Sequence, residues 1–283
     1  MINLTDMINI TDIISIDIIV YILSIYDLYG LYKVYKIFKN MYILKQKLMF
    51  NNCIIIYNKP KRKYIYKITL NIFEYICNGY IFDIDDYKNI MNKLENCKLN
   101  NNSINIIYDT YGGEIQANDI VSNYIIESKI KINGYVFNKS QSAGTILALL
   151  SDNLYINKNA ILSPTDPQIT IDDETFSIKS IINMCESKEH NYISDKYLLQ
   201  YYENKKLHYE NIDMITRLIN KKLRKHISKE KKKDLIYELT SGDYTHYKPI
   251  SGLYLNKYID INLDMPKNIT DIYNIYENAY FYL

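Results

Sequence analysis

Residues 104–115 read INIIYDTYGGEI, and residues 137–149 read FNKSQSAGTILAL. In each stretch a short, mainly apolar run ends at a turn of small residues, and a helix-like segment follows. Short apolar runs bounded by turns predict buried strands. Strands that alternate with helices along the chain predict a largely parallel sheet. The two stretches therefore predict an α/β fold.

Neighbouring segments extend this alternation in both directions. We expect strands over residues 53–57, 64–68, 104–108, 130–137, 154–156 and 160–162. We expect helices over residues 85–97, 114–127, 142–151, 178–186 and 195–226. The first two strands are separated by a turn at Asn58-Lys59-Pro60, since proline and asparagine favour turns.

Composition excludes several classes of protein. The chain has 283 residues, of which 48% are hydrophobic and 23% charged, as in ordinary globular proteins. A net charge of +2 gives no global field that would attract nucleic acid. The four cysteines and four histidines are scattered without metal-ligand spacing, so we expect no disulfide scaffold, no metal and no cofactor.

The N-terminal 50 residues contain the candidate membrane anchor. Residues 13–32 are mainly apolar and are followed by five lysines between positions 33 and 47. About 20 apolar residues can span a bilayer, and flanking lysines favour the cytoplasmic side. Asp17 and Asp27 oppose insertion, although both lie toward the ends of the window. The alternative is an amphipathic helix packed on its own domain or on a partner, which would leave the protein cytoplasmic.

Two turns carry residues with chemical potential. Gly112 and Gly113 follow a buried strand, where glycine permits unusual backbone angles and exposes amides to a ligand. Ser142 begins the next small-residue helix. It could serve as an N-cap, for which serine is preferred, or as a nucleophile whose oxyanion is held by backbone amides.

Four segments together resemble the serine dehydrogenase proteinases, which are SppA-like members of the ClpP/crotonase superfamily. Residues 108–113 (YDTYGG) match that family's HTPGG, and residues 142–149 (SAGTILAL) match its SGGTLIAL. Residues 160–169 (AILSPTDPQI) match AVLGPIDPQI, and residues 239–250 (LTSGDYTHYKPI) match LTSGxWTHxxPI. Tyr111 replaces the family's proline, and Ala143 replaces its first glycine after the serine.

This resemblance implies a ClpP/crotonase-like fold of repeated ββα units, with an N-terminal apolar helix and a helical C-terminal region. The peptidase domain would cover residues 51–250, after the anchor of residues 1–50. Residues 251–283 and the 195–226 helix would take part in subunit contacts of a homo-oligomer. The implied activity is an ATP-independent, membrane-associated serine endopeptidase that acts on protein or peptide substrates, with its catalytic domain on the cytoplasmic side.

The resemblance also implies the site residues. Ser142 would be the nucleophile, and the amides of Gly113, Gly112 and Ala143 would form the oxyanion hole. SppA-like enzymes use a lysine as the base, and an ungapped alignment from Ser180 places it at Lys188.

Alternatives to this base remain open. Glu186 and Glu189 flank Lys188 and would keep its amine charged. The other candidates for the base are Lys196, Lys206 and His246. Asp166, in a Pro-Thr-Asp-Pro turn, would either support the site or simply form an Asx turn.

Two further functions compete with the peptidase. One is a catalytically degenerate ClpP-fold scaffold or interaction protein that keeps the fold but lacks a working base. The other is crotonase-type acyl-CoA chemistry, which also uses paired backbone amides but is not supported by the segment around Ser142. Reaction of Ser142 with a serine-directed probe separates these functions.

Overall fold

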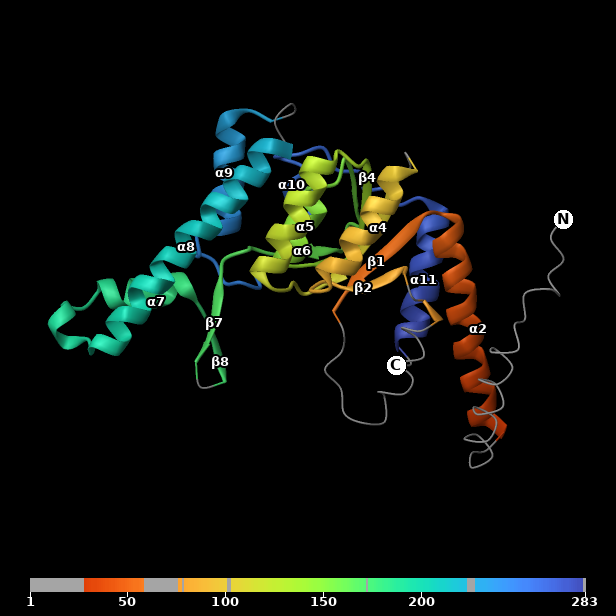
Figure 1. The fold of residues 1–283 in the computed structure, drawn as a ribbon, viewed down its shortest axis with the longest axis horizontal. Helices are drawn as coiled ribbons and strands as arrows, with labels where there is room; N and C mark the ends of the chain where they lie inside the picture. Colours follow the sequence, from red (N-terminus) through yellow and green to blue (C-terminus); the bar gives the residue numbers. More distant parts are fainter. Residues whose placement is uncertain are drawn as a thin grey trace.

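The computed structural model describes residues 28–58, 76–77, 79–100, 103–171, 173–222 and 227–281. A seven-stranded sheet lies at its centre, in the order β2-β1-β3-β4-β6-β9, with β5 also paired to β4 (Figure 1). These strands are β1 (Cys53–Tyr57), β2 (Ile81–Asp83), β3 (Ile104–Thr110), β4 (Ile132–Ser140), β5 (Asn153–Ile156), β6 (Ile161–Leu162) and β9 (Ile250–Ser251).

The sheet is parallel except at one edge, where β9 pairs antiparallel with β6. Every residue of β1 is buried, as expected for a strand that is covered on both faces. Its side chains alternate between two cores: Ile54 and Ile56 enter one, Cys53 and Ile55 the other. The α/β class and the parallel sheet are confirmed, whereas a repeated ββα superhelix is not.

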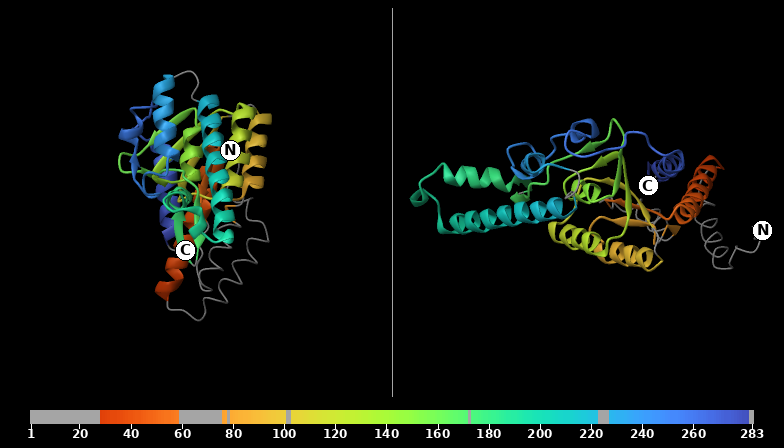
Figure 2. Two further views of the ribbon diagram at one scale, coloured as in Figure 1. Left: turned by 90° about the vertical axis from the view of Figure 1, so that its left-hand side faces the viewer. Right: turned by 90° about the horizontal axis from the view of Figure 1, so that it is seen from above.

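Helices cover both faces of the sheet. The helices α4 (Tyr87–Leu99), α5 (Ile115–Ser128) and α6 (Ala143–Leu149) lie over one face. The helices α2 (Leu28–Phe50) and α11 (Lys267–Phe281) pack on each other over the opposite face. Figure 2 shows α2 and α11 together at one end of the molecule.

An arm projects from the other end of the molecule (Figures 1 and 2). It comprises the β7–β8 hairpin (Gln168–Ile171 and Glu174–Ser177), α7 (Ile178–Glu186), a 3-10 turn and the first half of α8 (Asp195–Lys222). The second half of α8 packs on the main core through Met214, Ile215, Leu218 and Ile219, together with α9 (Lys229–Thr240). Thus α8 joins an exposed arm to the buried body.

The C-terminal residues form part of the fold. Leu255 of α10 (Gly252–Leu255) is buried in the main core. In α11, the Tyr273 ring stacks on Phe137 with centroids 4.3 Å apart. The Tyr276 hydroxyl donates to Asp109, with an O–O distance of 3.2 Å. The tail is therefore packed within its own chain, and its role in subunit contacts stays a prediction.

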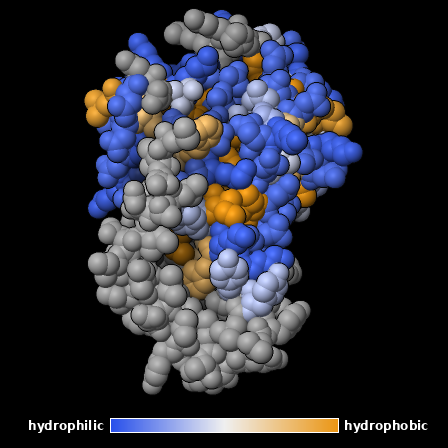
Figure 3. Space-filling model, turned by 90° about the vertical axis from the view of Figure 1, so that its right-hand side faces the viewer, coloured by the Kyte–Doolittle hydropathy of each residue, from blue (hydrophilic) through white to orange (hydrophobic). Residues whose placement is uncertain are grey.

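Most of the apolar window at residues 13–32 lies outside the described residues, as does the strand expected over residues 64–68. Among the helices that the structure describes, none is long and apolar enough to cross a membrane. Of the described residues that are visible on the face at the α2 side, most are hydrophilic, with separate apolar patches (Figure 3).

Three sets of strands were not predicted: β2, the β7–β8 hairpin and β9. β9 has only two residues. β2 has only three residues, too few to give a periodic signal. The β7–β8 hairpin carries mainly exposed or half-buried side chains, so no apolar run marks it.

Candidate active site

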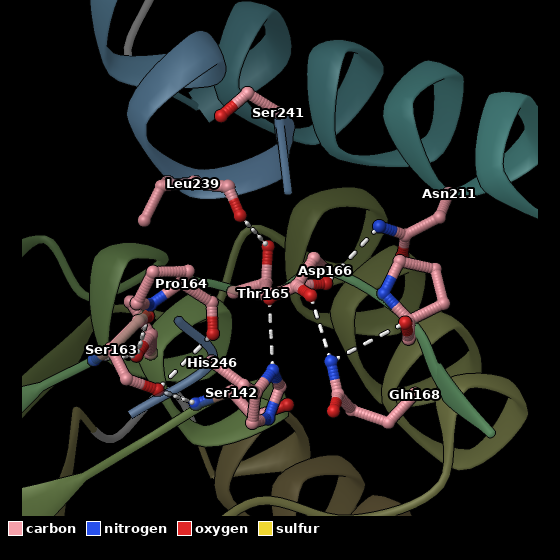
Figure 4. A network of polar contacts seen from close by, with 12 residues as sticks. Ser142, Ser163, Pro164, Thr165, Asp166, Gln168, Asn211, Leu239, Ser241 and His246 are labelled. Carbon is pink, nitrogen blue, oxygen red and sulfur yellow. Dashed lines mark hydrogen bonds and ion pairs between the residues drawn. The ribbon is translucent and has the colours of Figure 1, made fainter. Parts of the chain in front are cut away.

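Strand pairing brings together three segments that are distant in the sequence, at the carboxyl ends of β4 and β6. Ser140 of β4 lies opposite Leu162 of β6, and Leu162 lies opposite Ile250 of β9. The chain leaves β4 and β6 at this end of the sheet, and it enters the antiparallel β9 at the same end. Ser142, Asp166 and His246 lie within four residues of these paired positions, and Figure 4 shows them in one polar network.

Ser142 stands at the turn between β4 and α6 in a strained conformation, with φ 50° and ψ −122°. Positive φ is uncommon for residues other than glycine, and such strain clusters at functional sites. The Ser142 amide donates to the Ser163 hydroxyl over 2.9 Å. Although Ser142 occupies the N-cap position of α6, its hydroxyl makes no capping hydrogen bond. Capping therefore does not account for this serine.

Asp166, which is fully buried, and His246, which is half-buried, form a hydrogen-bonded pair. The His246 Nδ1 lies 2.9 Å from Asp166 Oδ1, and the Asp166 side chain is 0% exposed. The second carboxylate oxygen accepts a hydrogen bond of 2.7 Å from Gln168 Nε2. The carboxylate thereby fixes the orientation of the imidazole, and no described residue bonds to Nε2.

The turn that carries Asp166 is held by two helices. Both the amide and the hydroxyl of Thr165 donate to the Leu239 carbonyl at the end of α9, over 2.7 and 3.0 Å. The Asn211 side chain, on α8, donates to the Thr165 carbonyl over 3.1 Å. These contacts hold the Asp166 carboxylate in place relative to the strand ends, so the Pro-Thr-Asp-Pro segment is more than an isolated turn.

The two glycines lie against the serine but differ in their amides. Gly112 has φ 108°, and a Cβ placed there would lie 2.7 Å from the Ser142 Cβ. Its amide donates to Thr110 Oγ1 over 3.1 Å, so it is not free for an oxyanion. The amides of Gly113 and Ala143 have no acceptor among the described residues. The expectation that Gly112 donates to the oxyanion is therefore not supported, because its amide is already bonded.

The structure does not bring Lys188 to Ser142. Lys188 is exposed and follows α7, whose first turn adjoins the β7–β8 hairpin. Nine helical residues rise about 13 Å, which carries the end of α7 outward along the arm. Lys196 and Lys206, also exposed, lie on α8. Of the candidate bases, His246 alone joins the network around the serine.

Sequence reasoning missed several supporting residues. Ser163 stands in a matched segment, but a serine there carried no distinguishing signal. Asn211 is buried on α8, and a buried amide on an amphipathic helix is a signal that could have been noticed. His208, one turn before Asn211, is also buried, and its burial lowers its pKa, with a smaller lowering effect from Lys179. Within the described ranges, no group of three or more His, Cys, Asp or Glu side chains could hold a metal.

A protein family matches nearly the whole chain. The family described as ClpP-like SDH-type serine proteinases matches residues 1–281. Uncharacterized protein MJ1495 of Methanocaldococcus jannaschii is 27% identical over 174 residues, which are 61% of this chain and 56% of that protein. Protein MJ0137 of the same organism, also uncharacterized, is 25% identical over 175 residues, 62% of this chain and 58% of that protein. The matches thus span less than two thirds of these relatives.

Two solved structures are also similar, both of the 1510-N membrane-bound stomatin-specific protease. A serine-to-alanine mutant gives a TM-score of 0.44 at 15% identity, covering 79% of this chain and 81% of that chain. A lysine-to-alanine mutant in complex with a substrate peptide gives 0.43 at 16% identity, covering 75% and 76%.

Proposed function

The chain belongs to the ClpP-like SDH-type serine proteinases, and from this premise we propose that it is a serine peptidase using Ser142, His246 and Asp166. This arrangement replaces the Ser142–Lys188 pair that the sequence suggested. It also gives Asp166 a defined role, because its carboxylate holds the imidazole that acts on the serine.

The proposed reaction is acyl transfer to the serine. His246 takes the proton of the Ser142 hydroxyl through Nε2 while Oγ attacks the scissile carbonyl carbon. The amides of Gly113 and Ala143 stabilise the resulting oxyanion. His246 then gives the proton to the leaving amine as the carbon–nitrogen bond breaks. Water, activated by the same imidazole, releases the acyl group and restores Ser142.

A single observation carries this proposal: His246 Nδ1 lies 2.9 Å from a fully buried carboxylate beside the turn that holds Ser142. A buried carboxylate bonded to one imidazole nitrogen fixes the tautomer and stabilises the imidazolium that forms during catalysis. The Ser142 hydroxyl makes no hydrogen bond to His246 in this structure. Such contacts are often long without substrate and shorten when substrate binds.

A fluorophosphonate probe tests the proposal. The probe should label the wild-type protein at Ser142, identified by peptide mass spectrometry, and should not label Ser142→Ala. Ser187→Ala is the control, because it removes an exposed hydroxyl in the arm that has no contact with Ser142. Absence of wild-type labelling would instead favour a non-catalytic scaffold.

We include membrane association and self-assembly in the proposal. The support for the first is the apolar window at residues 13–32 and the lysines that follow it. Full-length protein should sediment with membranes, and protein starting at residue 28, which keeps α2, should not; equal behaviour of the two would contradict the anchor. Light scattering should show a homo-oligomer at micromolar concentration, and a monomer would contradict self-assembly.

A further inference from the structure

Asn58 contacts the Gly112-Gly113 turn from the neighbouring strand. It directly follows β1, and the parallel pairing of Tyr57 with Asp109 places it opposite Thr110. Its Oδ1 accepts hydrogen bonds from Thr110 Oγ1 (2.8 Å) and from the Tyr111 amide (2.6 Å). Its Nδ2 donates to the Gly112 carbonyl over 2.7 Å. One side chain therefore makes three hydrogen bonds to three successive residues.

The remaining amides of this turn are also engaged, with one exception. The Gly112 amide donates to Thr110 Oγ1 over 3.1 Å, and the Glu114 amide donates to Asp85 Oδ1 over 2.6 Å. From Tyr111 to Glu114, the Gly113 amide is the one without an acceptor among the described residues. It is also the amide that the proposed mechanism requires.

Two adjacent glycines have more conformational freedom than any other pair of residues. An oxyanion donor contributes fully only when it is held in place before the reaction begins. We propose that Asn58 is a positioning residue that fixes the Gly112 peptide and thereby aims the Gly113 amide at the oxyanion. This inference rests on the proposed peptidase function, and Asn58 itself touches neither the substrate nor the reacting atoms.

A purely structural role for Asn58 would give different kinetics. Loss of stability alone lowers the folded fraction but leaves kcat of the folded enzyme unchanged. Loss of oxyanion positioning lowers kcat and leaves KM nearly unchanged, because the interaction forms in the transition state. It also weakens the binding of a peptide boronic acid by the same factor by which it lowers kcat. This inhibitor forms a tetrahedral adduct that resembles the transition state.

Asn105 supplies a matched control at the opposite end of the sheet, near the amino ends of the strands. Its side chain also makes three hydrogen bonds: Nδ2 donates to the Asn51 carbonyl over 2.7 Å, and Oδ1 accepts from Asn133 (3.0 Å) and Tyr135 (3.1 Å). Asn105→Ala therefore removes a comparable set of amide hydrogen bonds from the amino end of β3, away from the serine.

The experiment measures kcat, KM and boronate inhibition with a fluorogenic peptide for full-length wild type, Asn58→Ala and Asn105→Ala. We expect Asn58→Ala to lower kcat about 10–100-fold, with KM within about twofold and boronate affinity reduced in the same ratio as kcat. We expect Asn105→Ala to keep the wild-type values at temperatures where all variants remain folded.

If Asn58→Ala fails to fold, Asn58→Asp replaces it. This variant keeps the oxygen that binds Thr110 and Tyr111 but loses the donor to Gly112, so it should lower kcat without changing KM. An Asn58 variant that is folded and as active as Asn105→Ala would overturn the role of Asn58 alone. A wild-type protein that reacts with neither probe nor peptide would overturn the peptidase and this inference together.

Discussion

The Asp166 carboxylate at the carboxyl ends of the strands is fully buried, whereas the Glu186–Lys205 ion pair of the α7–α8 arm is exposed to solvent. At the strand ends, the Asp166 side chain is 0% exposed and both of its oxygens have partners. In the arm, Glu186 pairs with Lys205 over 2.7 Å, but their side chains are 44% and 34% exposed. The Asp166–His246 pair is therefore suited to proton transfer, whereas water screens the Glu186–Lys205 pair.

This comparison changes the assignment of the base. Lys188 is exposed at the outer end of α7 in the arm, away from the turn that holds Ser142. His246 lies at the strand ends with one ring nitrogen already bonded to Asp166. The two candidates were separable only once burial and strand pairing were known.

The largest loss of activity is expected when the buried Asp166 carboxylate is neutralised. Asp166→Asn keeps the size of the side chain but removes the charge that orients the imidazole and stabilises its protonated form. We expect kcat to fall about 10³–10⁴-fold. Asp119→Asn, at an exposed ion pair with Arg217, is the control and should keep wild-type kcat. Similar kcat in both variants would show that Asp166 does not serve the base.

Two glycines with positive φ test how closely the oxyanion turn is packed. In Gly112→Ala the new Cβ would lie 2.7 Å from the Ser142 Cβ, whereas at Gly79, with φ 80°, a Cβ would meet nothing within 4 Å. Both substitutions strain the backbone, but Gly112→Ala alone displaces the serine. We expect about a 100-fold loss of kcat in Gly112→Ala and unchanged kcat in Gly79→Ala, each followed by peptide hydrolysis and thermal unfolding. Equal kcat losses would contradict the close contact.

His208 allows the effect of burial to be tested within α8, because it is buried near the point where the exposed arm joins the body of the molecule. Its pKa is lowered mainly by burial, and secondarily by Lys179, while Asp166 and Asp243 act in the opposite direction. The unfolded chain therefore binds a proton at a higher pH than the folded chain does. Stability conferred by the neutral imidazole is present above the ordinary histidine pKa and is lost as pH falls below it.

Replacing His208 should flatten this dependence. Chemical denaturation between pH 8 and pH 5 should show a shallower loss of unfolding free energy in His208→Gln than in wild type. The difference cannot exceed about 1.4 kcal/mol per pH unit for one proton. Parallel curves for the two proteins would mean that His208 does not contribute.

The smallest effect is expected in the arm itself. Glu186→Gln removes the ion pair with Lys205 but leaves both side chains in solvent. We expect no measurable change in kcat and little change in Tm, whether measured in low or high salt. A marked loss of activity would show that the arm is coupled to the serine.

Much of the fold follows from the sequence because its buried strands are local apolar runs. The strand at residues 53–57 and the helix at residues 178–186 have the predicted bounds. The β7–β8 hairpin has no such run, since its side chains are largely exposed. Its existence depends on where the chain leaves β6, which no local pattern records.

The site was less predictable for a related reason. Ser142 and Gly113 could be proposed because the segments that contain them resemble two motifs of a known family. The partnership of Asp166 with His246 spans 80 positions and arises from the antiparallel pairing of β9 with β6. Asn58 was assigned only to a turn, because its three hydrogen bonds reach a different strand. Residues whose role depends on strand order cannot be identified from spacing.

The most direct test of the central claim compares the two candidate bases in one assay. We would measure kcat/KM for peptide hydrolysis by His246→Ala and Lys188→Ala, with folding of each checked by circular dichroism. We expect a loss of about 10³-fold or more in His246→Ala and a value within about twofold of wild type in Lys188→Ala. Near wild-type kcat/KM in His246→Ala, together with loss of activity in Lys188→Ala, would contradict this claim.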